Sequence, residues 1–254
     1  RHDPKFKMAS REALTQGYYD IGKTVDAVIG TQFKYLPKAP LEIRPYEEFR
    51  EKYEAGGSYQ QGTPDGSRPG IFYFNAYDLP SRTTPGMTTL YLHEGAPGHH
   101  FQISIAQENE KLPAFMRFGG NTAYVEGWAL YAETLGDELG AYDGDPVGQL
   151  GYLQSIAFRA CRLVVDTGIH AKGWTKQQAI AFMTDNSALS AANIEAEAAF
   201  LGACLIDNRV LEDLPVPLTP EHFFEPLHGR IFAKLADVAG NNMLANPVTL
   251  KPYF

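Results

Sequence analysis

Hydrophobic positions recur at helical spacing along most of the chain. The first such segment runs from Ser10 to about Gly30, and a shorter one, PYEEFREKYEA, follows LPKAPLEIRP. Further helices are predicted at about 99–110, 121–139, 148–171 and 175–187. The last of these has Thr175 and Gln178 at the spacing of a capping box. The pattern therefore predicts a mainly helical chain.

One region breaks the helical pattern. Residues 56–70, GGSYQQGTPDGSRPG, have the composition of a loop, and the segment IFYFNAYDL that follows them is rich in aromatic and β-branched residues, which favour a strand. It is the one strand that the sequence predicts. After SRTTPG, the stretch MTTLYLHEGA returns to helical character, with Thr88 or Thr89 near its start. We therefore expect a mainly α fold with a small β element.

Composition limits the classes of function. With 254 residues, 44% of them hydrophobic, the chain can bury a core as one large domain or two small ones. Its net charge of -8 argues against general binding to nucleic acid or anionic membranes, because both favour a basic surface. No apolar run approaches the roughly 18 residues of a membrane span. The first residues, RHDPKFKMAS, lack an initiator Met and a signal-peptide core, so we expect the chain to start inside a longer gene product.

A phosphate-loop pattern occurs by coincidence. Residues 17–24, GYYDIGKT, satisfy GxxxxGK[ST], but a working phosphate loop follows a buried strand, and REALTQ precedes this one. Its two tyrosines would also crowd a phosphate. We therefore predict neither nucleotide binding nor a motor ATPase.

The motif HEGAPGHH, residues 93–100, concentrates three of the chain's seven histidines and one glutamate in eight positions. In the zinc-peptidase pattern HExxH, two imidazoles lie one helical turn apart, and the glutamate serves as general base toward a water molecule. Here Pro97 takes the position of the second histidine. In an undistorted helix His100 would lie beneath His93, but about 10 Å along the axis.

A bulge at Pro97 and Gly98 would solve this geometric problem by bringing His99 round to His93. We therefore predict His93 and His99 as metal ligands, with His100 as the alternative ligand or a supporting residue. Glu94 is the predicted general base. The competing interpretation is a set of hydrogen-bonded core histidines with no metal.

A third protein ligand should be a carboxylate on a neighbouring helix, which leaves one position open on a Zn²⁺ ion. The segment NTAYVEGWALYAETLG offers Glu126 and Glu133, seven residues apart and so on one helix face. Glu126 is flanked by Tyr124 and Trp128, a setting that indicates burial, and it is the predicted ligand. For both glutamates the alternative is a solvent-exposed position.

A polar stripe follows in FRACRLVVDTGIHAKG, where Arg159, Arg162, Asp166 and His170 are spaced three, four and four residues apart. Ion pairs such as Arg162 to Asp166 would explain the stripe as a structural feature. Alternatively, His170 or an arginine faces the metal and stabilises an oxyanion or a substrate carboxylate. His170 is therefore a candidate catalytic residue, and Arg159, Arg162 and Tyr124 are candidate substrate-binding residues.

Four segments, AGGSYQQGTPDGSRPGIFYFNAYDLPSR, YLHEGAPGHHFQ, YVEGWALYAE and RLVVDTGIHAKGWT, resemble in this order the C-terminal half of a bacterial family, domain of unknown function 885. The similarity covers about residues 1–192. It implies a zincin-like helical catalytic domain with a peptidase-like activity carried by the residues predicted above. It also implies that IFYFNAYD is an edge strand, which would hold an extended peptide by strand addition.

Residues 193–254 are similar to the start of the N-terminal domain of the replicative DNA helicase of the DnaB type. The segments EAE, LGA, IDN, HFFEPLHGRIF and PVTLKPYF occur in the helicase order. From the residues alone this is a short helical module, whose second helix is entered at Thr219 and Pro220. The resemblance implies a role like that of this domain in DNA replication, namely self-association or contact with primase. The helicase motor is not part of the similar segment.

The chain is therefore predicted to be a fusion of two partial domains, residues 1–192 and 193–254. The leading hypothesis is a Zn²⁺-dependent hydrolase of a peptide or small amide. It would be inactive if the partial family domain expected here leaves the substrate cleft incomplete. The competing hypothesis is a non-enzymatic interaction module in which residues 193–254 bind a second copy or a primase-type partner. Neither predicts direct binding to nucleic acid. A cytoplasmic location is expected only if the helicase-like tail is genuine.

Overall fold

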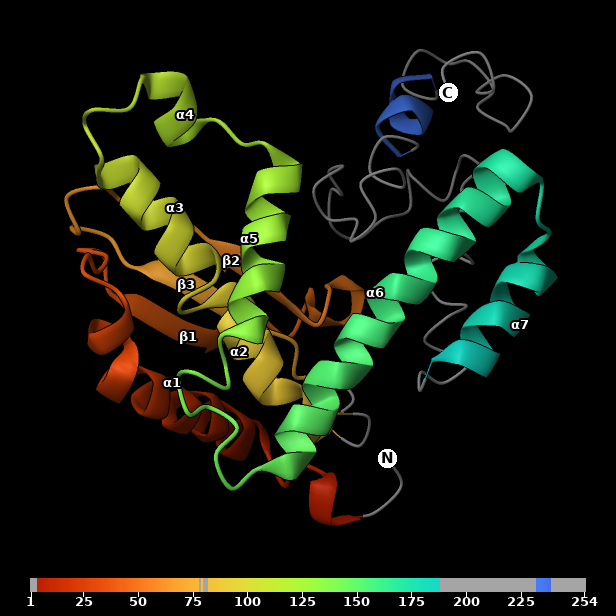
Figure 1. Cartoon of the computed structure of the whole chain (residues 1–254), viewed down its shortest axis with the longest axis horizontal. Helices are drawn as coiled ribbons and strands as arrows, with labels where there is room; N and C mark the ends of the chain where they lie inside the picture. Colours follow the sequence, from red (N-terminus) through yellow and green to blue (C-terminus); the bar gives the residue numbers. More distant parts are fainter. Residues whose placement is uncertain (1–3, 78, 80–81, 188–231, 239–254) are drawn as a thin grey trace. The chain divides into compact units, whose positions relative to one another are not determined.

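The computed structural model describes residues 4–77, 79, 82–187 and 232–238 (Figure 1). The chain divides into two compact units, Arg1–Ser155 and Ile156–Phe254. Helices dominate the described residues, and the predicted class, mainly α with a small β element, is confirmed. No described helix is long and apolar enough to cross a bilayer. Of residues 193–254 the structure describes 232–238, which form a short helix. The rest of this segment, including Thr219 and Pro220, lies outside the described residues.

The α-helices are α1 (Arg11–Gln32), α2 (Met87–Glu94), α3 (His99–Glu108), α4 (Ala114–Phe118), α5 (Thr122–Thr134), α6 (Pro146–Lys172) and α7 (Lys176–Asn186). Short polar side chains begin several of them. Ser10 caps α1 by accepting from the Ala13 backbone N–H at 3.1 Å. The capping box predicted for Thr175 and Gln178 is confirmed at the start of α7. The phosphate-loop pattern GYYDIGKT lies inside α1 and forms no loop.

One predicted helix is wrong. The segment PYEEFREKYEA forms only a 3-10 turn over Glu51–Tyr53. Its backbone carbonyls are used in a tertiary contact, because the Asn75 side-chain amide donates to the carbonyls of Glu51, Glu54 and Ala55. Because these carbonyls accept from Asn75, they hold the segment as a turn against the sheet and do not accept the backbone hydrogen bonds of a regular helix.

The sheet has three strands, β1 (Leu41–Pro45), β2 (Gly57–Gln60) and β3 (Gly70–Phe74), in the order β1-β3-β2. β1 pairs with β3 in parallel and β2 pairs with it antiparallel. The sequence predicted only β3, and β2 lies in the segment predicted to be a loop. The expected edge strand is also wrong, because β3 is central and both of its edges are paired. β2, with the sequence GSYQ, has no hydrophobic alternation, so its pairing with β3 defines it. β1, with the sequence LEIRP, does alternate apolar and polar residues, but over only five positions.

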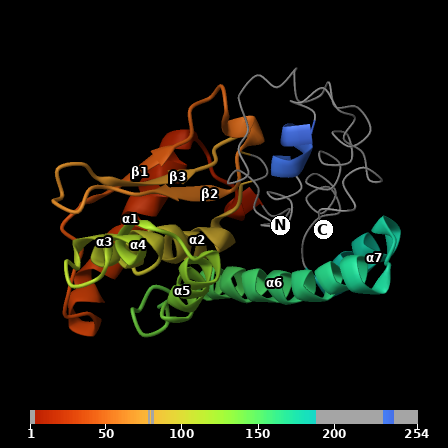
Figure 2. The same cartoon turned by 90° about the horizontal axis from the view of Figure 1, so that it is seen from above.

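One face of the sheet carries the hydrophobic core. The ring of Tyr18 on α1 packs against Phe72 and Phe74 of β3 at centroid distances of 5.0 and 4.9 Å. Tyr91 on α2 reaches the same Phe72 ring at 6.3 Å. Figure 2 shows α2 and α3 against the sheet, with α5 on the side of these helices away from it. Burying each of these rings contributes roughly 1.5–3 kcal/mol, which fixes the helices to the sheet.

A complete break, rather than a bulge, separates α2 from α3. α2 ends at Glu94, and α3 begins at His99 with the Gln102 backbone N–H donating to the Gly98 carbonyl at 3.0 Å. A Cβ atom on Gly98 would lie 1.9 Å from the carbonyl oxygen of His93. Only glycine permits this approach, and it sets His99 beside His93.

Replacing Gly98 with alanine should therefore destabilise the protein, by about 2 kcal/mol or more, because the added methyl group overlaps backbone atoms that cannot rotate away. Chemical denaturation measures the change in the free energy of unfolding. Gly30→Ala is the matched control, since a Cβ there meets nothing within 4 Å and the residue lies in α1. The control should gain about 0.5–1 kcal/mol. Equal stabilities for the two variants would contradict the assignment of the break to Gly98.

Candidate metal centre

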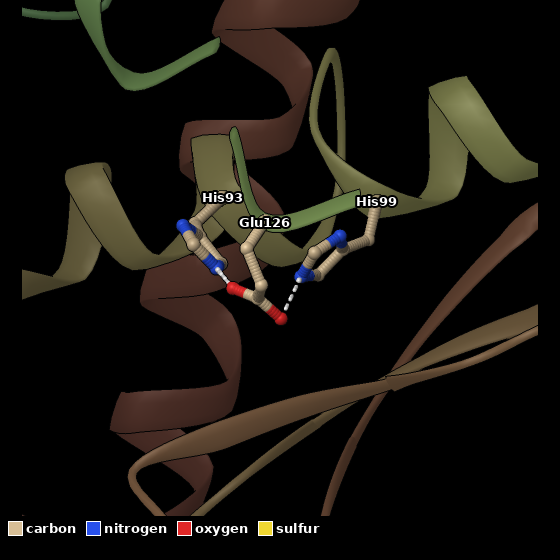
Figure 3. Close-up of side chains that lie close together, drawn as sticks. All are labelled: His93, His99 and Glu126. Atoms are coloured by element: carbon tan, nitrogen blue, oxygen red, sulfur yellow. Dashed lines mark ion pairs between the residues drawn. The ribbon is translucent and has the colours of Figure 1, made fainter. Parts of the chain in front are cut away.

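Three side chains from three helices meet at the break (Figure 3). His93 lies in the last turn of α2, His99 begins α3, and Glu126 lies on α5. His93 Nε2 lies 3.4 Å from Glu126 Oε2, and His99 Nε2 lies 3.7 Å from Glu126 Oε1. One ligand atom from each of the three residues lies within 4.8 Å of the others. The structure thus brings together the three residues that the sequence analysis singled out as metal ligands.

The geometry of this triad fits a zinc ion. Bonds of about 2.0–2.1 Å to a tetrahedral zinc place neighbouring ligand atoms about 3.3–3.5 Å apart, close to the two nitrogen–oxygen distances found here. Two imidazoles and one carboxylate are also the donor set of several catalytic zinc sites, in which the fourth position stays open. The donor set of the triad therefore matches that of such sites.

Glu126 occupies an open setting, contrary to the prediction of burial. Its side chain is 55% exposed, whereas His93 and His99 are buried. Its sequence neighbours do not cover it, because Tyr124 is 63% exposed and the Trp128 indole N–H donates to the Pro97 carbonyl at 2.7 Å. The triad is therefore closed on the histidine side and accessible on the glutamate side.

His100 is held away from the triad. Its Nδ1 lies 3.0 Å from the hydroxyl of Tyr59 on β2, and the two rings meet edge to face at a centroid distance of 5.6 Å. Burial lowers the pKa of His100 to about 4. These contacts make it a neutral core histidine that ties α3 to the sheet, which leaves His99 as the partner of His93.

Glu133 supports the site from behind, although the sequence analysis offered it only as a second-choice ligand or an exposed residue. It is 1% exposed. Its two carboxylate oxygens bind His93 Nδ1 at 2.8 Å and the Thr89 hydroxyl at 2.6 Å. The sequence signal was present in the spacing, because Glu133 lies two helical turns after Glu126. A carboxylate on Nδ1 turns Nε2 of His93 toward the metal position.

The two histidines of the triad have opposite proton affinities. Burial lowers the pKa of His93, but hydrogen bonds with Glu126 and Glu133 outweigh it and raise the pKa to about 9. Burial and the neighbouring His93 charge lower the pKa of His99 to about 4. Without metal, one protonated histidine therefore stands between two carboxylates, where a metal ion would replace the proton.

Glu94 is buried at the last position of α2, next to His93. Its negative charge contributes to the raised pKa of His93. Burial raises the pKa of Tyr18 and of Tyr46, and the charge of Glu94 adds to both shifts. The carboxylate therefore lies within electrostatic range of the first ligand and of the aromatic core.

The polar stripe on α6 makes local contacts. His170 Nε2 lies 3.6 Å from Asp166 Oδ1, and both side chains are nearly half exposed. The Arg162 guanidinium lies 5.5 Å from the centre of the Phe158 ring. Asp166 thus pairs with His170, and the ion pair expected between Arg162 and Asp166 stays a prediction. The catalytic role of His170 and the substrate-binding roles of Arg159, Arg162 and Tyr124 stay predictions.

Comparison with known families gives two matches. Residues 1–199 match the family described as "Bacterial protein of unknown function (DUF885)", and residues 190–254 match the "DnaB-like helicase N terminal domain". The replicative DNA helicases DnaB of Rickettsia felis and Rickettsia conorii are each 37% identical over 59 residues, which make up 23% of this chain and 12% of theirs. The chain thus spans only 12% of the length of these relatives. The predicted boundary after residue 192 falls where the two matches overlap.

Two solved structures share the fold. A protein of Colwellia psychrerythraea, provisionally described as a lipoprotein, superposes with a TM-score of 0.70 at 30% identity, over 90% of this chain and 42% of its own. A second such protein, of unknown function from Shewanella oneidensis, gives a TM-score of 0.59 at 20% identity, over 89% of this chain and 44% of its own. The chain spans less than half of either protein.

The pairing of His93 with Glu133 predicts a pH-dependent stability in the metal-free protein. Because the folded pKa of His93 is about 9 and the unfolded value is 6.5, the stability from its protonation is fully present below pH 6.5 and is lost as the pH rises through 9. Glu133→Gln should therefore cost about 3 kcal/mol at pH 6 and clearly less at pH 10, where His93 is neutral and its Nδ1–H can donate to a glutamine as well as to a glutamate.

Urea unfolding in the presence of a chelator, at both pH values, measures this difference. Glu138→Gln is the control, because Glu138 is exposed on the same segment, and its effect should stay within about 0.5 kcal/mol. A loss for Glu133→Gln that is the same at pH 6 and pH 10 would show that the buried pair is not ionised as described.

Proposed function

The chain belongs, over residues 1–199, to the bacterial DUF885 family, and from this premise we propose that it is a zinc-dependent hydrolase of peptide or amide bonds. One observation carries the proposal. Two buried histidines on either side of a helix break face the carboxylate of Glu126, with ligand atoms within 4.8 Å of one another. Such a cluster, open on one side, has the form of a catalytic metal site.

Each residue of the site has a distinct role in the proposed reaction. His93, His99 and Glu126 would hold zinc, which when bound supplies positive charge to polarise the carbonyl group of the substrate. Glu94 would accept the proton of the attacking water molecule as general base. Glu133 would hold His93 in the tautomer that presents Nε2 to the metal. The exposed side of Glu126 gives the substrate its approach.

β2 would hold the substrate, as an outer strand next to the triad. Its Tyr59 touches His100, the residue after the ligand His99. The Gly56 carbonyl accepts from the Asn75 N–H, so Gly56 bonds toward β3. Because bonding alternates along an antiparallel strand, the backbone N–H and C=O groups of Gly57 and Tyr59 face away from β3. An extended peptide would add to β2 there, in the role that the sequence analysis gave to IFYFNAYD.

A second candidate function rests on residues 190–254, which match the helicase N-terminal domain. In this proposal the tail acts as an interaction module that binds a second copy of itself or a primase-type partner. The Rickettsia relatives are replicative helicases, but the shared segment makes up 12% of their length, so none of their motor activity transfers. The two functions are compatible within one chain.

We expect the purified chain to carry zinc in near-stoichiometric amount, measured by elemental mass spectrometry before any chelator is added. His93→Ala should abolish the bound metal, because it removes one of three ligands. Glu94→Gln should keep the metal and lower peptide cleavage by about 100-fold or more, because it removes only the general base. His170→Ala is the control and should keep the metal.

Zinc content that is unchanged in His93→Ala would disprove the ligand assignment. Absence of zinc from the original chain, persisting after incubation with excess zinc, would disprove the hydrolase. Self-association of the whole chain, followed by sedimentation, would then become the function to test.

Strand addition predicts an alternating effect of peptide modification. In a cleaved peptide, single N-methyl groups should lower kcat/KM by about tenfold at every second residue along β2, because each removes one backbone hydrogen bond of about 1–1.5 kcal/mol. The residues between them should tolerate the methyl group. Uniform tolerance at all positions, in a peptide that is still cleaved, would exclude β2 as the binding strand and leave the hydrolase intact.

A further inference from the structure

Two buried polar atoms in the first turn of α3 have no hydrogen-bond partner within the part of the chain that the structure describes. They are Nδ1 of His99 and Oε1 of Gln102. An unpartnered polar atom in the interior costs free energy, so each such atom calls for an explanation. These two are complementary, because an imidazole nitrogen can donate and an amide oxygen only accepts.

The helix places the two side chains on one face. Residues three apart on an α-helix are neighbours on its surface, and Gln102 follows His99 by three residues. The orientation of the amide is set by its other end, where Nε2 of Gln102 donates to the Tyr124 carbonyl at 3.2 Å. Oε1 is therefore the end left for another donor.

The proposed metal site decides which nitrogen of His99 donates. Nε2 of His99 is the atom that faces Glu126, at 3.7 Å. If Nε2 binds a metal ion, the ring proton must reside on Nδ1, and a ligating histidine normally donates that proton to a nearby acceptor. In the first turn of α3, Oε1 of Gln102 is the acceptor without a partner.

We propose that Gln102 is the positioning residue for His99, accepting a hydrogen bond from Nδ1 when Nε2 holds the metal. This inference rests on the proposed function. The same side chain reaches the backbone of α5 at Tyr124, two residues before Glu126. Gln102 thus fixes the second ligand and ties its helix to the helix of the third.

The two histidines are then supported by partners of different charge. His93 donates to the carboxylate of Glu133, and His99 donates to a neutral amide. With Glu94, Glu126 and Glu133 ionised, three negative charges already outweigh the charge of a doubly charged metal ion. A neutral partner on His99 adds directional hydrogen bonding without a further buried charge.

The affinity for zinc tests this assignment. Gln102→Met keeps the length of the side chain and removes both polar atoms, and it should weaken zinc binding 10- to 100-fold in competition with a chromophoric chelator. Gln107→Met is the matched control, a buried glutamine farther along α3, and should leave the affinity unchanged. Gln102→Asn, whose side chain is one methylene shorter, should also weaken zinc binding. It provides the test if the methionine variant does not fold.

Nitrogen NMR gives a readout that a merely structural role would not change. In the zinc-loaded protein, long-range ¹H–¹⁵N spectra should show a slowly exchanging proton on Nδ1 of His99, and Gln102→Met should lose it. Wild-type affinity in both Gln102 variants, or an equal loss in Gln107→Met, would overturn the inference while the metal site stands. A wild-type chain that binds no zinc would overturn the inference together with the proposed function.

Discussion

The contact between the backbone of Gly98 and the carbonyl of His93 is the constraint on which the site depends. It allows α2 to end and α3 to begin within four residues, and so places two histidines six positions apart on facing helix ends. Pro97 has no backbone N–H to donate to the previous turn. Its carbonyl accepts a hydrogen bond from the Trp128 indole on α5. That bond brings the helix of Glu126 to the break. The turn therefore assembles all three ligands from one local irregularity.

Burial then sets the electrostatics of the assembled site. A buried carboxylate behind His93 holds a positive charge in the metal-free state, and the neighbouring His99 is kept neutral by the same burial. In the proposed site, a metal ion would replace this proton among the same carboxylates. Because Glu126 is half exposed, the exchange takes place at the surface side of the triad. The cost of burying Glu133 is offset by its contacts with His93 and Thr89.

The sequence predicted most of the helices and the grouping of His93, His99 and Glu126 because both depend on local signals. Ser10, Thr175 and Gln178 begin helices by bonding to their own chain, and the spacing of the motif left few ways to pair His93. Burial could not be predicted in the same way, since it depends on which helices pack together. Glu126 and Glu133 share one helix face, yet one is half exposed and the other is 1% exposed. The strands beside β3 were missed for a related reason, because β1 and β2 are only five and four residues long and gain their structure from pairing with β3.

The ligands and their supporting residues all lie between Thr89 and Glu133, inside the unit Arg1–Ser155. Among the residues that the structure describes, the candidate site therefore rests on contacts within one compact unit. Peptide hydrolysis asks more of a protein than metal binding, because a substrate must also be held and shielded from water. The chain spans 42% of the Colwellia protein, so the surfaces that complete such a cleft need not lie within the shared part. Under the proposed function, metal affinity and catalysis are thus separable, and a chain that binds zinc at full strength can still be a poor peptidase.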